Sequence, residues 1–188
     1  MLSGRRLDLL APDPRDIDIE DIAHGLARVA RWNGQTKGDH AFSVAQHCVI
    51  VTDIFTALWP QSTSNERLAA LLHDAPEYVV GDLISPFKTA IGLDYKAFEL
   101  KLLEAIHERF GVGQLSVAVA AAIKDADTIA AYYEATLLAG FEKSEAERFF
   151  GIPRVPLELH RTLDVLISVP AKDAQRDFLL RFGNLSPH

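Results

Sequence analysis

The residues of this chain best suited to chemistry are the adjacent pair His73 and Asp74, followed by Glu77. An imidazole and a carboxylate at neighbouring backbone positions can both reach one divalent cation. Glu77 lies three residues on, one helical turn away, where its carboxylate could hold a water molecule beside that cation. Apolar residues in the range 68–72 lead up to the pair and place it at the inner edge of a core. A His-Asp dipeptide is common, so the prediction depends on ligand-type residues elsewhere.

His47 and Asp127 are the further ligand candidates. His47 falls in the first turn of a predicted helix whose apolar residues over 51–58 point into the core, and a core histidine bonded to a backbone carbonyl is the alternative. Asp127 lies on the apolar side of a long predicted helix, where a carboxylate must be paired, hydrogen-bonded or bound to metal. An ordinary ion pair with Lys124 is the alternative there. His40, in a loop before the helix, competes with His47 as the first ligand.

These candidates form one set that would come from three helices: His47, His73, Asp74 and Asp127. Two imidazoles and two carboxylates suit a divalent transition ion and leave coordination positions for water and a substrate oxygen. We therefore expect one divalent metal ion as cofactor. Mn²⁺, Co²⁺ and Zn²⁺ fit best, and Ni²⁺, Fe²⁺ and Mg²⁺ are further candidates.

Several other polar residues could bind a substrate. Arg31 could form a guanidinium fork for phosphate, and Trp32 a flat wall for a sugar or base. A helix-terminal cation beside a packing aromatic is an equally good interpretation of this pair. Asp82, Lys88 and Lys124 are further candidates around the loop after His73-Asp74, although each alone is more typical of solvated surface.

The elements that must position these residues are all predicted to be helices, because no alternating run is long enough to suggest a sheet. Residues 1–16 are punctuated by proline and aspartate and should form an irregular N-terminal arm. Capping signals at Asp18, Ser43, Ser64, Asp94 and Ser116 open the predicted helices. These are expected over residues 18–32, 43–58, 64 to past 74, 94–111 and 116–140, with a loop over 80–93. Shorter helices of unassigned role should follow within 141–188, near 144–150, 156–168 and 171–182.

Length and composition indicate one all-α domain over residues 1–188, long enough to bury a sizeable core. Its hydrophobic residues, 48% of the chain, are ordinary for a soluble protein. Cys48 is the one cysteine, so no internal disulfide can form and a cytoplasmic location fits best. No apolar stretch has the length of a membrane span. The net charge of −7 argues against binding a nucleic-acid polymer.

The motifs around these residues resemble those of the HD-domain metal-dependent phosphohydrolases, in particular the bacterial 5′-deoxynucleotidase and phage dATP triphosphohydrolase branch. That family has a His, then His-Asp, then a distant Asp. The matching segments are residues 30–32, 43–47, 72–77, 81–82, 85–88 and 124–127, within roughly residues 20–140. Gln46 stands where the family usually has Glu before its first histidine.

The resemblance implies an all-α, single-domain HD-type bundle with its metal between core helices. It assigns the metal to the four residues of the ligand set and water positioning to Glu77, with Asp82 as a second catalytic candidate. Arg31 corresponds to the phosphate-binding Arg and Trp32 to the sugar-screening Trp. Lys88 and Lys124 resemble lysines that hold the polyphosphate in the triphosphohydrolase branch.

The activity implied is hydrolysis of a small nucleotide phosphoester. We favour a 5′-deoxynucleotidase acting on deoxynucleoside monophosphates over a deoxynucleoside triphosphate triphosphohydrolase. Family members commonly self-associate, so a homo-oligomer is expected. A non-catalytic helical module that keeps the metal for stability or nucleotide sensing is the alternative from another class. The third hypothesis is a helical protein in which His73 and Asp74 only form an ion pair in the core.

Overall fold

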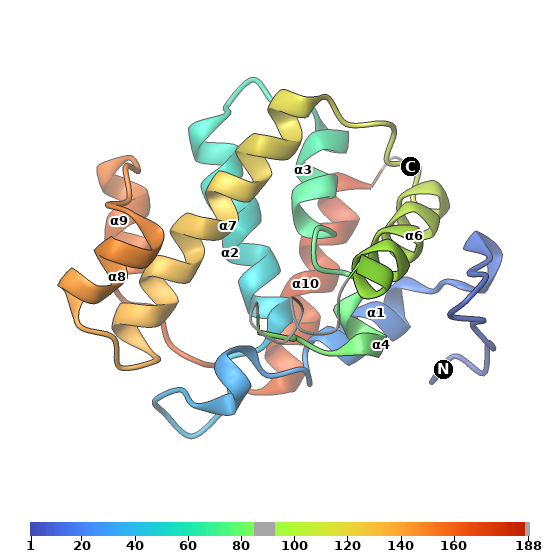
Figure 1. The fold of residues 1–188 in the computed structure, drawn as a ribbon, viewed down its shortest axis with the longest axis horizontal. Helices are drawn as coiled ribbons and strands as arrows, with labels where there is room; N and C mark the ends of the chain where they lie inside the picture. Colours follow the sequence, from blue (N-terminus) through green and yellow to red (C-terminus); the bar gives the residue numbers. More distant parts are fainter. Residues whose placement is uncertain (85–92, 187–188) are drawn as a thin grey trace.

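Helices make up nearly all the regular structure of the computed structural model, which describes residues 1–84 and 93–186. No strand occurs among these residues, apart from an isolated antiparallel bridge between Ala30 and Ser43. The helices share one hydrophobic core (Figure 1), so the prediction of an all-α domain is confirmed. Within the described ranges, no helix has both the length and the apolar character needed to cross a membrane.

Two long helices, α2 (Val44–Leu58) and α7 (Val117–Leu137), pack side by side at the centre of the fold (Figure 1). Ala126 and Ala130 of α7 are fully buried, and such small side chains let helix backbones approach closely. The other side of α2 packs against α3 (Ser64–Leu71) and α10 (Ala171–Leu185). This centre places α2, α7 and the end of α3 next to one another.

The shorter helices surround this centre. α1 (Ile19–Leu26) packs against α4 (Glu77–Val80) and α10. α6 (Leu93–Arg109) lies at one edge, and α8 (Lys143–Phe150) and α9 (Leu157–Leu163) lie at the opposite end of the molecule (Figure 1). The N-terminal arm is irregular except for a 3₁₀ turn, η1 (Pro14–Asp16).

The contact between α1 and α4 is unusually close. A Cβ atom at Gly25 would lie 2.8 Å from both the Cβ and the carbonyl oxygen of Tyr78. Real Cβ atoms do not approach other atoms so closely, so α4 can occupy this place only because residue 25 is glycine. Glu77 is the first residue of α4 and is held in place by the same packing.

The prediction of a first helix over 18–32 is wrong at its C-terminal end. α1 begins after its Asp18 cap as predicted but ends at Leu26. The chain then pairs with the segment before α2, because Arg31 N donates to Phe42 O at 2.8 Å and Val44 N donates to Val29 O at 3.0 Å. Arg31 and Trp32 consequently lie in a short 3₁₀ element, η2 (Arg31–Gly34), and not at a helix end.

The predicted third helix also differs. Thr63, one residue before the predicted cap Ser64, caps α3 and forms a full capping box with Glu66. α3 ends at Leu71, so His73 and Asp74 lie in the turn between α3 and α4. Pro76 accounts for this break, since proline lacks an N–H and disfavours helical conformation in the residue before it.

The remaining boundaries lie close to those predicted, with Ser43 capping α2 and Ser116 capping α7. α9 is shorter than the predicted 156–168, and α10 extends beyond 182 to Leu185. Only part of the predicted 80–93 loop can be compared. Lys88 lies outside the described residues.

Candidate metal centre and its cavity

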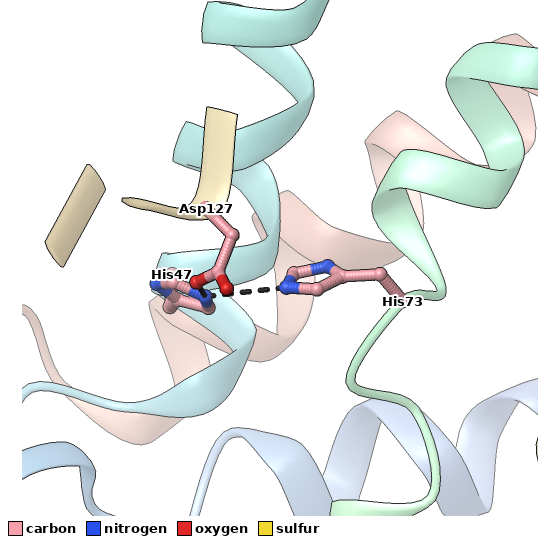
Figure 2. Close-up of side chains that lie close together, drawn as sticks. All are labelled: His47, His73 and Asp127. Atoms are coloured by element: carbon pink, nitrogen blue, oxygen red, sulfur yellow. Dashed lines mark hydrogen bonds and ion pairs between the residues drawn. The ribbon is translucent and has the colours of Figure 1, made fainter. Parts of the chain in front are cut away.

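Three segments bring ligand-type side chains together: α2 supplies His47, the α3–α4 turn supplies His73 and Asp74, and α7 supplies Asp127. Figure 2 shows the side chains of His47, His73 and Asp127 pointing toward one another from these segments. His40, the competing first ligand, is exposed in its loop and takes no part in this group. The structure thus places the four predicted ligands at one point.

Several donor atoms of this group lie 3.2–3.4 Å apart. The Nε2 atom of His47 lies 3.3 Å from His73 Nε2 and 3.2 Å from Asp127 Oδ1. Asp74 Oδ2 lies 3.4 Å from the same atom of His47 and 3.3 Å from His73 Nε2. Ligand atoms about 2.1 Å from one ion would lie about 3.0–3.4 Å from one another. His47, His73 and Asp127 could therefore hold a metal ion. Asp74 offers a further carboxylate oxygen at this spacing from the two Nε2 atoms.

In both His47 and His73, a hydrogen bond from Nδ1 leaves the other ring nitrogen, Nε2, facing the candidate metal position. His73 Nδ1 donates to the carbonyl oxygen of Ala70 at 2.8 Å. His47 Nδ1 lies 2.5 Å from Glu134 Oε1 and donates to it. A histidine that gives its Nδ1 proton to an oxygen presents the lone pair of Nε2, which is the usual arrangement around a bound metal.

The charges of this cluster are strongly coupled. Burial and Arg31 oppose protonation of His47, but Glu134, Asp127 and Asp74 outweigh them and raise the pKa of His47 well above its usual value. Burial disfavours the charged carboxylate of Asp74, but the two histidine rings outweigh it and hold the Asp74 pKa well below its usual value. Protons and metal ions compete for these same ligand atoms.

Glu134, which the sequence analysis did not identify, is fully buried. It connects the candidate metal ligand His47 to Arg31 and Trp32. Its Oε2 atom accepts hydrogen bonds from Trp32 Nε1 at 2.9 Å and from Arg31 Nη2 at 3.2 Å, while its Oε1 binds His47. Burial opposes its ionisation, but Arg31 and His47 outweigh burial and lower its pKa to about 2. Glu134 lies seven residues after Asp127, two turns along the same face of α7, and that spacing is the signal that could have found it.

Arg31 and Trp32 are held firmly on this carboxylate. The Arg31 side chain is 13% exposed and lies between Glu134 and Asp82, whose Oδ2 is 3.5 Å from Arg31 Nη1. Trp32 has φ +55° and ψ +31°, in the left-handed region that bulky residues rarely occupy. Such strain persists only where the surroundings enforce it, as the Glu134 hydrogen bond does here.

Lys124 forms the predicted ion pair with Asp127, with Nζ 2.6 Å from Oδ2. The other oxygen of Asp127 faces His47. The two interpretations of Asp127, ion-pair partner and ligand, are therefore compatible. The Lys124 side chain is 76% exposed and can follow an incoming anion.

A cavity of about 440 Å³ opens beside the ligand cluster. This volume lies within the range of small-molecule sites. Its charged lining contains most of the residues proposed from the sequence: Arg31, Asp74, Glu77, Asp82, Lys124 and Asp127. Glu77 is only 2% exposed, so its carboxylate is largely shielded from solvent.

No family model matches the chain. One curated protein does: the uncharacterized protein RCAP_rcc00048 of Rhodobacter capsulatus is 57% identical over 154 residues, which are 81% of this chain and 79% of that protein. Identity of this extent over most of both chains shows common descent. The chain therefore belongs to the same protein family as this uncharacterized Rhodobacter capsulatus protein.

Proposed function

We propose that this protein is a metal-dependent phosphohydrolase that releases phosphate from 2′-deoxynucleoside 5′-monophosphates. The observation that carries the proposal is a cluster of two imidazoles and two carboxylates whose carboxylates line one cavity together with Arg31 and Glu77. A purely structural metal would need neither Arg31 nor Glu77. The resemblance to HD-domain phosphohydrolases supports the same assignment.

His47, His73, Asp74 and Asp127 would hold the divalent ion. When bound, such an ion draws charge from a phosphoryl oxygen and lowers the pKa of a bound water, to about 7 in favourable zinc sites. The fit of the site to an ion rests on the 3.2–3.4 Å distances that join His47 Nε2 to one atom of each of the other three residues. It rests also on the hydrogen bonds that turn both Nε2 atoms inward.

Glu77 would accept the proton of the attacking water. It lines the same cavity as Asp74 and Asp127 and is nearly buried, so solvent competes little for its carboxylate. General-base catalysis of this kind contributes about 10²–10⁴-fold in rate. The water oxygen forms the new P–O bond while the P–O5′ bond breaks. O5′ takes up a proton, which balances the one that Glu77 accepts, and the deoxynucleoside leaves as its 5′-alcohol.

Arg31 would bind the phosphate, because its guanidinium is fixed in place and lines the cavity. Glu134 and Asp82 position it from two sides. Trp32, which lines the cavity beside Arg31, would stand near C2′ and disfavour a ribose hydroxyl.

A triphosphohydrolase is the second candidate, and Lys124 is the observation that favours it. Its ammonium group lines the cavity and could bind a longer phosphate chain. The products separate the two: inorganic phosphate from a monophosphate, or tripolyphosphate from a triphosphate.

The test is a turnover screen of nucleoside mono- and triphosphates with Mn²⁺, Co²⁺, Zn²⁺ and Mg²⁺, with identification of the products. We expect phosphate release from deoxynucleoside monophosphates in the presence of at least one of these ions. Tight nucleotide binding without product over hours, with every metal, would instead identify a non-catalytic binding module.

A further inference from the structure

The cavity has a second kind of lining, made of aromatic rings. Phe149 and Phe150, the last two residues of α8, line it together with Trp32. The ring centres of Trp32 and Phe150 lie 6.2 Å apart, and those of Phe149 and Phe150 lie 6.3 Å apart. The cavity therefore offers charged groups for a phosphate and flat apolar surfaces for another part of the same molecule.

Phe149 is 58% exposed, although phenylalanine is usually among the most buried residues. Its ring nevertheless has neighbours within the protein. The guanidinium carbon of Arg148 lies 5.0 Å from the ring centre, and the Phe141 ring centre lies 6.4 Å away. An aromatic ring that is exposed at the wall of a polar cavity is suited to bind a flat ligand.

Trp32 links this aromatic lining to the ligand cluster. Glu134 bonds Trp32 through one carboxylate oxygen and His47 through the other. The buried carboxylate of Glu134 thus sets the position of Trp32 relative to the metal ligand His47. A nucleotide with its phosphate near Arg31 would have its base available for contact with these rings.

We propose that Phe149, with Phe150 and Trp32 beside it, stacks against the base of the bound nucleotide. This inference rests on the proposed function and narrows it. The preferred substrates are phosphate esters that carry a purine or pyrimidine, and a sugar phosphate without a base should be hydrolysed less efficiently. Stacking tolerates different bases because every base has a π face, so all four deoxynucleotides should be accepted.

The kinetic test compares 2′-deoxyadenosine 5′-monophosphate with 2-deoxyribose 5-phosphate, which lacks the base. We expect Phe149→Ala to lower kcat/KM for the nucleotide by roughly 5- to 100-fold, mainly through KM, the loss typical of one base–aromatic stack. The value for the base-free substrate should not change. Phe149→Tyr keeps an aromatic ring and should retain most of the wild-type kcat/KM for the nucleotide.

Leu180→Ala is the matched control. Leu180 lies on α10 with an exposure of 59%, nearly equal to that of Phe149, and does not line the cavity. Its truncation should leave both substrates unaffected. An equal loss on both substrates in Phe149→Ala, or no loss on either, would overturn the stacking assignment.

A binding measurement separates this inference from the proposed function. The 5′-methylenephosphonate analogue of 2′-deoxyadenosine 5′-monophosphate has a P–C bond that hydrolysis cannot cleave, so calorimetry gives its Kd whether or not the protein is an enzyme. A Kd raised roughly 5- to 100-fold by Phe149→Ala and retained by Phe149→Tyr supports the base site even if no substrate turns over. Absence of binding to the wild-type protein, or an unchanged Kd in Phe149→Ala, overturns it.

Discussion

Two neighbouring residues of α7, Tyr133 and Glu134, each contact a histidine, and the two contacts differ in almost every other respect. Glu134 binds His47, and both side chains are fully buried. The Tyr133 hydroxyl lies 2.7 Å from Nδ1 of His160, which belongs to α9. The other ring nitrogen of His160, Nε2, lies 3.3 Å from Oδ2 of Asp164, the C-cap residue of the same helix. Consecutive residues of a helix lie on different faces, so α7 supports both groups at once.

The difference between these two groups shows when a contact between a histidine and an acidic residue indicates a candidate metal site. The side chains of His160 and Asp164 are 47% and 50% exposed, so water screens their interaction and can replace it. Around His47, further ligands arrive from two other segments. No second group of three metal-ligand residues occurs in the described ranges 1–84 and 93–186. The candidate metal centre is distinguished by the number of ligand residues that meet there and by the burial of His47. The presence of a histidine next to an acidic residue does not distinguish it, because His160 and Asp164 have that too.

The largest expected effect comes from Asp74→Ala. Removing this carboxylate should abolish both the content of divalent metal and the release of phosphate, because the ion loses a charged and partly buried ligand. Metal per chain would be measured by mass spectrometry after loading with Mn²⁺ and dialysis. Asp164→Ala, which removes the acid of the other histidine pair, should keep both properties. Undiminished turnover in metal-free Asp74→Ala protein would refute the account.

The next effect tests Glu134. Glu134→Gln keeps the shape of the side chain but removes the charge that orients His47, and we expect a 10- to 100-fold loss of metal affinity, roughly as for other residues that hold a metal ligand. Glu134→Ala should also lower the free energy of unfolding by about 3–5 kcal/mol, because Arg31 loses a buried partner. Metal titration and urea unfolding measure the two effects. Equal metal affinity in wild-type and Glu134→Gln protein would mean that Glu134 has no part in the site.

A smaller effect on stability is expected at the contact between α1 and α4, which holds Glu77 in place. Gly25→Ala should lower the free energy of unfolding by about 1–3 kcal/mol, because the new methyl group meets Tyr78. Gly183 lies in α10, and a Cβ atom added there would meet nothing within 4 Å, so Gly183→Ala should stabilise the protein by up to about 1 kcal/mol. Urea unfolding of both variants gives the comparison. A Gly25→Ala protein as stable as wild type would disprove the tight α1–α4 contact.

The smallest effect is expected at the second histidine group. Tyr133→Phe removes one hydrogen bond and should lower the free energy of unfolding by about 0.5–1.5 kcal/mol. Metal content should equal that of wild type. Loss of metal in this variant would show that the two groups on α7 are coupled, and the contrast between them would fail.

The helices that the sequence predicted well are those with local signals. Ser43 and Ser116 cap α2 and α7 through their own side chains, and the apolar periodicity that follows them is long. Errors arose where distant contacts decide the structure. The end of α1 depends on backbone pairing with residues before α2, which no pattern within α1 can show.

Gln46 illustrates the same limit. Its backbone N–H completes half of the predicted capping box with Ser43. Its side chain does not return to the cap but accepts from Val169 N and donates to Ile167 O, each at 3.1 Å. These partners are more than a hundred residues away, and they tie the start of α2 to the segment before α10.

The candidate site was predictable as far as residue types and helix faces could indicate it. His47, His73, Asp74 and Asp127 were chosen by type and face, and the structure places them together. Glu134 was missed because its partners His47, Arg31 and Trp32 lie 87 to 103 positions away in the sequence. Phe149 and Phe150 were missed because the family resemblance ends before α8.

The central claim is that one ion binds among His47, His73, Asp74 and Asp127, and anomalous diffraction from Mn²⁺-soaked crystals tests it most directly. We predict a single strong anomalous peak within about 2.0–2.3 Å of both Nε2 atoms and of a carboxylate oxygen. Absence of that peak at saturating Mn²⁺, or a peak bound only by other residues, would contradict the account.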